Sequence, residues 1–217
     1  MKINALSKTY EGRKVLSTPA FELNSGEICV LVGANGSGKS SLAKAIAGVI
    51  SDDYGAKPLE EKLNVGYMPQ KSYAFRMSTL RNLTLAGGDE AAAMEMLKKL
   101  GIDHLAKAPA KKLSGGESAR MALGRVMMEK HELLILDEPT ASMDMESTAL
   151  SEALIMDYCK KSGAAILWVT HSLAQARRVA DKAMFLRKRE MIEFGLAVKV
   201  LNSPEKEETK EFLKFYE

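Results

Sequence analysis

The sequence has few cysteines, and this scarcity argues against a disulfide-stabilised secreted protein. Its 217 residues include two, Cys29 and Cys159, which are too few for the disulfide framework of a small secreted domain. Cys29 lies in an apolar run, where a buried and unreactive thiol is expected. The cysteine content therefore favours a reducing cytoplasm.

Long apolar runs and a strong excess of one charge are also missing. No stretch approaches the ~18 apolar residues that a membrane span requires, and residues 1–4 do not begin the apolar core of a signal peptide. We therefore expect that any role at a membrane depends on another chain that crosses it. The 31 basic residues nearly balance the 28 acidic ones, leaving a net charge of +3, which does not favour a nucleic-acid partner.

The composition, with 46% hydrophobic and 27% charged residues, is that of an ordinary globular protein. Apolar runs at 28–32, 133–136 and 164–169 show no alternation, as expected of strands that are buried on both faces. Segments with helical periodicity separate them. The sequence therefore predicts an α/β protein with a mainly parallel central sheet covered by helices on both faces.

Around this core we expect antiparallel strands at the N-terminal side and an inserted helical lobe. The lobe should begin at residue 71 and extend to 112, or to about 130 with the next helix, and Asp89 can cap a helix that ends at Leu100. The other predicted elements are strands at 3–6, 21–23, 63–68, 183–186 and 191–194, a hairpin turn at 9–13, a turn-rich segment at 54–62, and helices at 41–49, 114–129, 145–162, 173–180 and within 203–217.

A glycine loop, Gly33-Ala34-Asn35-Gly36-Ser37-Gly38-Lys39-Ser40, lies between the first buried strand and a predicted helix. It fits G-x-x-x-x-G-K-[ST], the pattern of a phosphate-binding loop. Glycines allow a tight turn in which successive N–H groups face an anion, and the helix N-terminus adds partial positive charge. Lys39 can bind the β- and γ-phosphates and the Ser40 hydroxyl can ligate Mg²⁺. The flanking strand and helix favour a nucleoside triphosphate site over a chance glycine-rich turn.

Three further polar residues lie at or just beyond the ends of predicted strands. Asp137 and Glu138 come after 133–136, and His171 follows the next strand by two residues. Because the carboxyl ends of parallel strands meet at one edge of a sheet, these residues can converge on the glycine loop. Asp137 can then face a Mg²⁺ held by Ser40, and Glu138 is placed to orient or deprotonate a water beside the γ-phosphate.

A second glycine-containing segment, Leu113-Ser114-Gly115-Gly116-Glu117, supports two interpretations. Ser114 and Glu117 have the spacing of a helix capping box, which needs no ligand, and the spacing alone favours this interpretation. The two glycines favour the other one, because they cost helix stability and expose backbone N–H groups that can approach a phosphate.

Together these motifs resemble those of the nucleotide-binding subunit of an ABC transporter, in the order of that family and over nearly the whole chain. Residues 33–40 match its Walker A motif, 133–138 match its Walker B motif and 113–117 resemble its LSGGQ signature; Gln70 matches the Q-loop, His171 the switch histidine and Tyr10 the residue that stacks on adenine, and 141–144 resemble the D-loop. His104 and His131 match no motif, and we expect both at the surface.

The resemblance implies a P-loop NTPase fold in which the helical lobe is inserted into a RecA-like core, with ATP and Mg²⁺ as cofactors. It implies that Glu138, His171 and Gln70 act in catalysis and that Ser40, Gln70 and Asp137 bind the metal. The nucleotide contacts that it implies are Tyr10, Gly33, Asn35, Gly36, Ser37, Gly38, Lys39, Ser40 and Ser41, together with Ser114, Gly115, Gly116 and Glu117 of a second subunit.

The partners implied by the resemblance are a second copy in a head-to-tail dimer, integral membrane permease subunits and, for an importer, an extracytoplasmic solute-binding protein. The chain would then lie at the cytoplasmic face of the cell membrane. Two residues depart from the family pattern: the signature ends in Glu117 rather than glutamine, and the D-loop has Met143 where alanine is frequent. A capping box would turn the Glu117 carboxylate into its own helix and away from a triphosphate.

The predicted function is ATP hydrolysis that energises a separate permease, as in a bacterial importer of a small solute such as an inorganic oxyanion or an amino acid. An ABC ATPase that acts in cofactor assembly or on a macromolecular complex, without a permease, would share every nucleotide motif. The segment 73–77, if exposed, would suit a permease's coupling helix. A module that binds ATP without hydrolysing it is disfavoured by the presence of Glu138 and His171.

Overall fold

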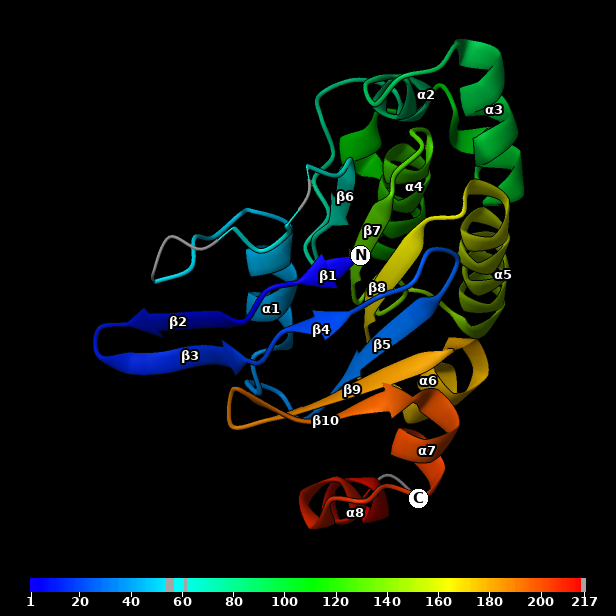
Figure 1. Ribbon diagram of the computed structural model, residues 1–217. Helices are drawn as coiled ribbons and strands as arrows, with labels where there is room; N and C mark the ends of the chain where they lie inside the picture. The colour runs from blue at the N-terminus through cyan, green and yellow to red at the C-terminus, as the bar shows by residue number, and fades with distance from the viewer. Residues whose placement is uncertain (54–56, 61, 216–217) are drawn as a thin grey trace.

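A twisted sheet with helices on both faces forms the body of the protein (Figure 1). The computed structural model describes residues 1–53, 57–60 and 62–215. Within these residues the strands are β1 (Lys2–Ile3), β2 (Leu6–Tyr10), β3 (Arg13–Thr18), β4 (Phe21–Glu22), β5 (Ile28–Val32), β6 (Val65–Met68), β7 (Leu133–Asp137), β8 (Ala165–Val169), β9 (Lys182–Arg187) and β10 (Glu190–Leu196).

The helices complete the α/β architecture. They are α1 (Lys39–Ile46), α2 (Thr79–Thr84), α3 (Glu90–Lys99), η1 (Asp103–Leu105), η2 (Ala110–Lys112), α4 (Gly115–Met127), α5 (Met145–Ser162), α6 (Leu173–Val179), α7 (Ala197–Asn202) and α8 (Glu207–Lys214), where η1 and η2 are short 3-10 helices. No helix of the described segments is both long and apolar enough to cross a bilayer.

The sheet is parallel at its centre and mixed at one side. Its strand order is β2-β3-β10-β9-β5-β8-β7-β6, and β1 pairs with β4 in a separate two-stranded sheet. The strands from β9 to β6 are parallel to one another, whereas β2–β3 and β9–β10 are antiparallel hairpins. Every residue of β5, β7 and β8 is buried, which confirms that the unbroken apolar runs are central strands covered on both faces.

Alternate residues of the central strands enter two different cores. In β5, Cys29 and Leu31 pack with α1, whereas Val30 and Val32 belong to the cluster that contains buried residues of α4, α5 and α6. This two-residue alternation is the consequence of strand geometry. It fixes the end of β5, and hence the glycine loop, between two layers of helix.

The segment between β6 and β7 is helical, as predicted. It contains α2, α3, η1, η2 and α4, and α2 and α3 lie beyond α4 at one end of the molecule, whereas α8 lies at the other (Figure 1). The side chain of Asp89 caps α3 by accepting a hydrogen bond from the Ala92 N–H, as predicted. That this region forms an inserted subdomain of a single ABC ATPase domain stays a prediction.

The N-terminal strands differ from the prediction. The turn lies at Glu11–Gly12, and the returning strand is β3, which pairs with β2 from Leu6↔Thr18 to Tyr10↔Arg13. Residues 21–23, predicted as the returning strand, contribute β4 instead and pair with β1. Polar residues at both ends of β3 concealed its strand character. Residues 54–56 and 61 of the predicted turn-rich segment lie outside the described residues.

Candidate active site

The glycine loop joins β5 to α1, as predicted. Its chain bends back on itself, with the Ser37 N–H donating to the Ala34 carbonyl at 3.1 Å. Gly33 has φ 148°, and a Cβ at this residue would lie 2.2 Å from the Leu186 carbonyl oxygen. Only glycine fits there, because an added side chain would collide with the backbone of β9. The loop is therefore seated directly against the neighbouring strand.

Lys39 is folded over this loop. Its Nζ donates hydrogen bonds to the carbonyl oxygens of Gly33 at 2.7 Å and Ala34 at 3.0 Å. Burial lowers the pKa of Lys39, and the carboxylates of Glu138 and Asp137 oppose that shift. The ammonium group is thus held at the loop before any anion binds.

Asp137 lies beside Ser40, as predicted from its place at the end of a buried strand. The Ser40 hydroxyl donates to Asp137 Oδ1 at 3.1 Å. Burial raises the pKa of Asp137, the hydrogen bond from Ser40 acts in the opposite direction, and the neighbouring Glu138 raises it further. A carboxylate that is destabilised in this way gains from a cation placed next to it.

Glu138 is the meeting point of three chain segments. Its Oε2 accepts a hydrogen bond from Gln70 Nε2 at 3.0 Å and lies 3.4 Å from Nδ1 of His171. Its backbone is left-handed, with φ 52°, and its N–H donates to the carbonyl of Val169 at 3.0 Å. Such a conformation costs a non-glycine residue about 1 kcal/mol and is frequent at functional sites.

Lys39, Ser40 and the Glu138 cluster, which consists of Glu138, Gln70 and His171, line one cavity of about 650 Å³. Both the glycine loop and the Glu138 cluster line it. A phosphate chain bound by the loop would therefore end beside a carboxylate, an amide and an imidazole. The lining residues are Val15, Asn35, Gly36, Gly38, Lys39, Ser40, Ser41, Gln70, Glu138, His171 and Arg189.

The cavity includes two residues that the sequence motifs did not indicate. Apart from residues 114–117, it leaves out four that they did: Tyr10, Gly33, Ser37 and Asp137. Val15 comes from β3, which was not predicted, and Arg189 from the β9–β10 turn, where no motif marks it. Gly33 and Ser37 lie beneath the cavity lining, and the buried Ser37 hydroxyl has no partner among the described residues. Tyr10 is 55% exposed at the end of β2, with Lys8 Nζ 5.4 Å from its ring centroid, and it does not line the cavity.

The segment from Ser114 to Glu117 forms the predicted capping box. The Ser114 side chain accepts from the Glu117 N–H, and Glu117 Oε2 accepts from the Ser114 N–H at 2.7 Å. That backbone hydrogen bond is the main reason why the pKa of Glu117 is lowered. The carboxylate therefore faces its own helix. None of these residues lines the cavity described above, so one chain does not bring the two motifs together.

Gly116 has a structural role in addition to any role in binding. A Cβ at this position would lie 2.9 Å from the Ser142 carbonyl oxygen. The glycine thus allows the segment 141–144, which resembles a D-loop, to pass close to the start of α4. The capping and binding interpretations are compatible, because the box satisfies the helix end while the second glycine permits this contact.

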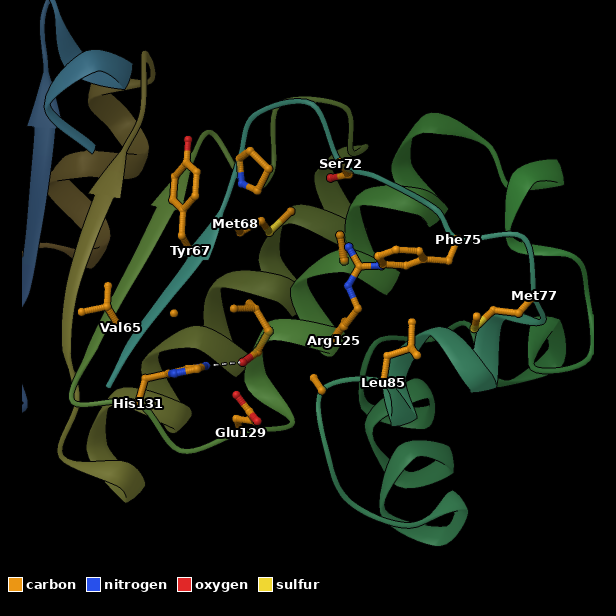
Figure 2. Close-up of a pocket in the computed structure, with 15 residues that line it drawn as sticks. Val65, Tyr67, Met68, Ser72, Phe75, Met77, Leu85, Arg125, Glu129 and His131 are labelled. Carbon is orange, nitrogen blue, oxygen red and sulfur yellow. Dashed lines mark hydrogen bonds between the residues drawn. The ribbon is translucent and has the colours of Figure 1, made fainter. Parts of the chain in front are cut away.

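A second cavity of about 560 Å³, here called the β6–α4 groove, lies between the edge strand β6 and the helices α2 and α4. Figure 2 shows the Arg125 side chain against the ring of Phe75, 5.1 Å from its centroid. Tyr73 is 60% exposed and meets Phe75 edge to face at 4.9 Å. The groove is lined by Val65, Gly66, Tyr67, Met68, Pro69, Ser72, Phe75, Met77, Leu85, Ala86, Ala122, Arg125, Val126, Glu129 and His131.

His131 corrects a prediction, because it is buried rather than a surface residue. Its ring occupies the space that a side chain on Gly66 would fill, with Nε2 2.8 Å from the Val126 carbonyl oxygen (Figure 2). The absence of a motif around His131 said nothing about burial, which is set by the glycine on the neighbouring strand. His104 is exposed, as expected.

Comparison with known proteins identifies the family. The model of the ABC transporter family matches residues 16–141. The chain belongs to the ABC transporter family. Its order of motifs makes it the ATP-binding subunit, which binds and hydrolyses ATP, as was predicted.

Several curated proteins are similar over most of the chain. The tungstate uptake system ATP-binding protein TupC of Peptoclostridium acidaminophilum is 38% identical over 85% of this chain and 92% of that protein. The zinc import ATP-binding protein ZnuC of Pseudomonas fluorescens is 33% identical over 87% and 74%. The molybdate/tungstate import ATP-binding protein WtpC of Methanocaldococcus jannaschii is 33% identical over 99% and 76%.

Solved structures confirm the fold. A chain of an ABC transporter in an inward-facing conformation aligns with a TM-score of 0.81 at 26% identity, covering 99% of this chain and 88% of that one. The ATP-binding subunit of another ABC transporter aligns with a TM-score of 0.82 at 23% identity, covering 98% of both chains. The P-loop NTPase architecture that the resemblance implied is therefore shared with ABC cassettes.

Proposed function

We propose that ATP hydrolysis in this chain drives import of a small inorganic ion through a separate membrane permease. The observation that carries the proposal is the Glu138 cluster, which joins the ATP cavity to the loop that borders the β6–α4 groove. Pro69 and Ser72 line the groove, while Gln70 between them donates to Glu138 in the other cavity. A partner in the groove would thus contact the segment that holds the catalytic carboxylate.

The loop residues bind the phosphates. Lys39 contributes a charge that is already positioned, and the backbone N–H groups around Gly36 and Gly38 act with the N-terminus of α1. Asn35, Ser40 and Ser41 complete this side of the cavity. Gly33 and Ser37 shape the loop from beneath, and Tyr10 reaches the adenine only if its exposed ring turns toward the cavity.

The donor set fits a magnesium ion. Mg²⁺ prefers oxygen ligands and is commonly held by one or two carboxylates together with substrate phosphates. The Ser40 hydroxyl and the Asp137 carboxylate, 3.1 Å apart, provide such oxygens. Gln70, the third predicted ligand, donates a hydrogen bond from its amide to Glu138. When bound, the ion would neutralise charge that develops on the phosphates.

Glu138 orients and deprotonates the attacking water. His171 contacts the same carboxylate and lies at the end of the cavity where the γ-phosphate binds. Gln70 donates to Glu138 and so links the site of the attacking water to the β6–α4 groove. A carboxylate near a γ-phosphate can act by hydrogen bonding to the nucleophile, and its placement among three segments limits its freedom before ATP arrives.

The remaining half of the site comes from a second copy of the chain. Ser114, Gly115, Gly116 and Glu117 are outside the cavity of their own chain, yet they start α4 with backbone N–H groups near a helix N-terminus, which suits an anion. A head-to-tail dimer would place them on the phosphates bound by the partner's glycine loop. Ser114 and the two glycines make this contact, and the Glu117 carboxylate stays turned into its capping box.

A helix of the permease occupies the β6–α4 groove, which places the chain at the cytoplasmic face of the membrane. Leu85, Met77 and Phe75 give the groove an apolar wall (Figure 2). The position of the groove beside the Gln70 loop favours a permease helix as the occupant, because transport requires that the partner sense the ATP site. An extracytoplasmic solute-binding protein would complete an import system.

For the solute, we propose an oxyanion of the tungstate and molybdate type. Two of the relatives named above serve tungstate or molybdate uptake, and the relative at 38% identity is one of them. This assignment rests on those relatives alone. Another relative serves zinc import. Zinc uptake that depends on this chain would replace the oxyanion as the proposed solute.

The test exchanges Leu85 for aspartate in the tagged full chain, expressed in its native cell. Leu85 is 52% exposed in the groove, so Leu85→Asp should keep the melting temperature while placing a charge against the docked helix. The expected result is loss of most of the permease that copurifies from membranes, identified by mass spectrometry, and an equal loss of tungsten or molybdenum accumulation.

Leu196→Asp is the matched control, because Leu196 is 53% exposed at the end of β10 and does not line the groove. It should retain both the permease and ion uptake. Recovery of the parent chain without any multi-spanning membrane protein, bound instead to a protein complex, would support the permease-free alternative. Undiminished capture by Leu85→Asp would remove the groove from the proposal.

A further inference from the structure

The turn between β9 and β10 contains two adjacent residues in the left-handed region. Lys188 has φ 50° and Arg189 has φ 71°. Neither is glycine, although glycine adopts this conformation without the steric cost that other residues carry. The two side chains differ in surroundings: Lys188 is exposed, whereas Arg189 is half-buried and lines the ATP cavity.

Arg189 is fixed to the glycine loop and to β3. Its N–H donates to the Ser37 carbonyl at 3.0 Å, and its carbonyl accepts from the Ser17 N–H at 2.7 Å. Its Nη1 donates to the Lys14 carbonyl at 2.5 Å. A Cβ added to Gly38 would lie 3.4 Å from the Arg189 Cα, so the arginine stands directly beside the N-cap of α1.

The Arg189 guanidinium is left with donors to spare. One of its N–H groups is used by Lys14, and no carboxylate pairs with it among the residues that the structure describes. A guanidinium has five N–H donors and is suited to phosphate oxygens. The remaining donors can therefore make charge-assisted hydrogen bonds to an anion in this cavity.

The position of Arg189 selects a part of the nucleotide. Glu138, Gln70 and His171 form one cluster in the cavity, and the terminal phosphate belongs there. Arg189 instead lies with Val15 over Gly38, whose added Cβ would be 3.2 Å from the Val15 carbonyl. Lys39 and Ser40 lie between these two groups along the loop, so the nucleoside end of the molecule extends toward Arg189.

We propose that Arg189 binds the α-phosphate side of ATP and acts with Lys39 as a second cation for the nucleotide. This inference rests on ATP binding in this cavity and is independent of the permease and the solute. It predicts a contact that ATP, ADP and AMP all share. It also gives a reason for arginine at a position where glycine would cost less.

The experiment measures affinity by titration calorimetry of the full chain with Mg-ATP, Mg-ADP and AMP. Arg189→Gly should weaken the binding of ATP, ADP and AMP by about the same factor, roughly tenfold for one charge-assisted hydrogen bond. Arg189→Lys should recover most of the affinity, whereas Arg189→Gln, which keeps a donor without the charge, should not. Lys188→Gly, in the same turn but outside the cavity, should bind within twofold of the parent.

Thermal unfolding without nucleotide separates binding from folding. Glycine adopts φ 71° freely, so Arg189→Gly should keep or raise the melting temperature while it loses affinity. The proposal is overturned if the affinity of Arg189→Gly for ATP is within twofold of the parent's, or if Lys188→Gly loses as much affinity as Arg189→Gly. It is equally overturned if Arg189→Gly binds ATP more weakly but ADP as tightly as the parent, since that would place Arg189 at the terminal phosphate.

Discussion

The chemistry proposed for this protein depends on the position of one carboxylate. Glu138 is held by its strained backbone, by the hydrogen bond from Gln70 and by the nearby His171. Glutamine in its place would keep the side-chain volume and one acceptor oxygen but could not take a proton from water. Binding and hydrolysis should therefore separate in that variant.

Glu138→Gln is expected to bind Mg-ATP about as well as the parent and to lose turnover by a factor of about 100 or more, since general base catalysis contributes this much. Phosphate release and equilibrium binding measure the two effects. Glu95→Gln, which changes an exposed acid paired with Lys98 on α3, should leave both unchanged. Hydrolysis at the parent rate by Glu138→Gln would mean that the assigned base is wrong.

At the scale of elements, a buried polar network ties the active-site loops to α5 and α6. The Gln175 side chain donates to Glu152 Oε1 and to the Thr140 hydroxyl, both at 2.9 Å, and accepts from the Thr170 hydroxyl at 2.7 Å. Arg178 donates to both oxygens of Glu152, at 2.6 and 2.8 Å. Because Thr140 follows Glu138 by two residues and Thr170 precedes His171, the network supports the two loops that carry them.

Glu152→Ala should lower the free energy of unfolding by about 2 kcal/mol, less than for a fully buried pair because Arg178 is half-exposed. Burial acts to raise the pKa of Glu152, but the hydrogen bonds from Arg178 and Gln175 outweigh it, so the folded pKa lies below the ordinary 4.5. The carboxylate therefore stabilises the fold above about pH 4.5, and this contribution is lost as the pH falls through the folded pKa.

Urea unfolding of the parent and the variant at about five pH values between pH 3 and pH 8 measures the difference in their free energies of unfolding. This difference should be constant near neutral pH and should disappear as the pH falls into the acid range. Asp157→Asn is the control, because Asp157 pairs with Lys161 on the exposed side of the same helix and should cost at most about 0.5 kcal/mol. An equal loss in both variants would contradict a special role for the network.

For the whole molecule, the separation of the two nucleotide motifs is the important feature. The cavity contains the glycine loop and the Glu138 cluster but none of the residues 114–117. Ser142 packs against Gly116, and Met145, three residues further along the chain, is 90% exposed at the start of α5. A large apolar side chain that is almost fully exposed beside a binding segment is consistent with an interface between copies.

Met145→Lys is expected to prevent ATP-dependent dimerisation without weakening ATP binding to the monomer. The substitution is best made together with Glu138→Gln, which should hold the dimer in its ATP state, and light scattering with and without Mg-ATP gives the mass. Phe215→Lys provides the control, since Phe215 is 87% exposed after α8, at the opposite end of the molecule from the lobe (Figure 1). A monomeric Glu138→Gln protein at saturating ATP would contradict the dimer.

Local sequence determined much of the fold and most of the residues of the ATP cavity. The unbroken apolar runs identified the central strands, because a strand covered on both faces has no polar side. The glycine loop, Asp137, Glu138 and His171 could be placed at one edge because each follows such a strand. The capping box at Ser114 could likewise be predicted, since its partners are only three residues apart.

What depends on contacts between distant segments appeared only in the tertiary structure. The pairing of β3 with β2 and with β10, the burial of His131 against Gly66 and the position of Arg189 over Gly38 each join residues that no local pattern relates. Their energies come from backbone pairing and packing across the fold, which a single segment does not encode. The sequence thus determined which chemical groups the ATP site contains, whereas the tertiary structure decided which of them share the cavity and which face away from it.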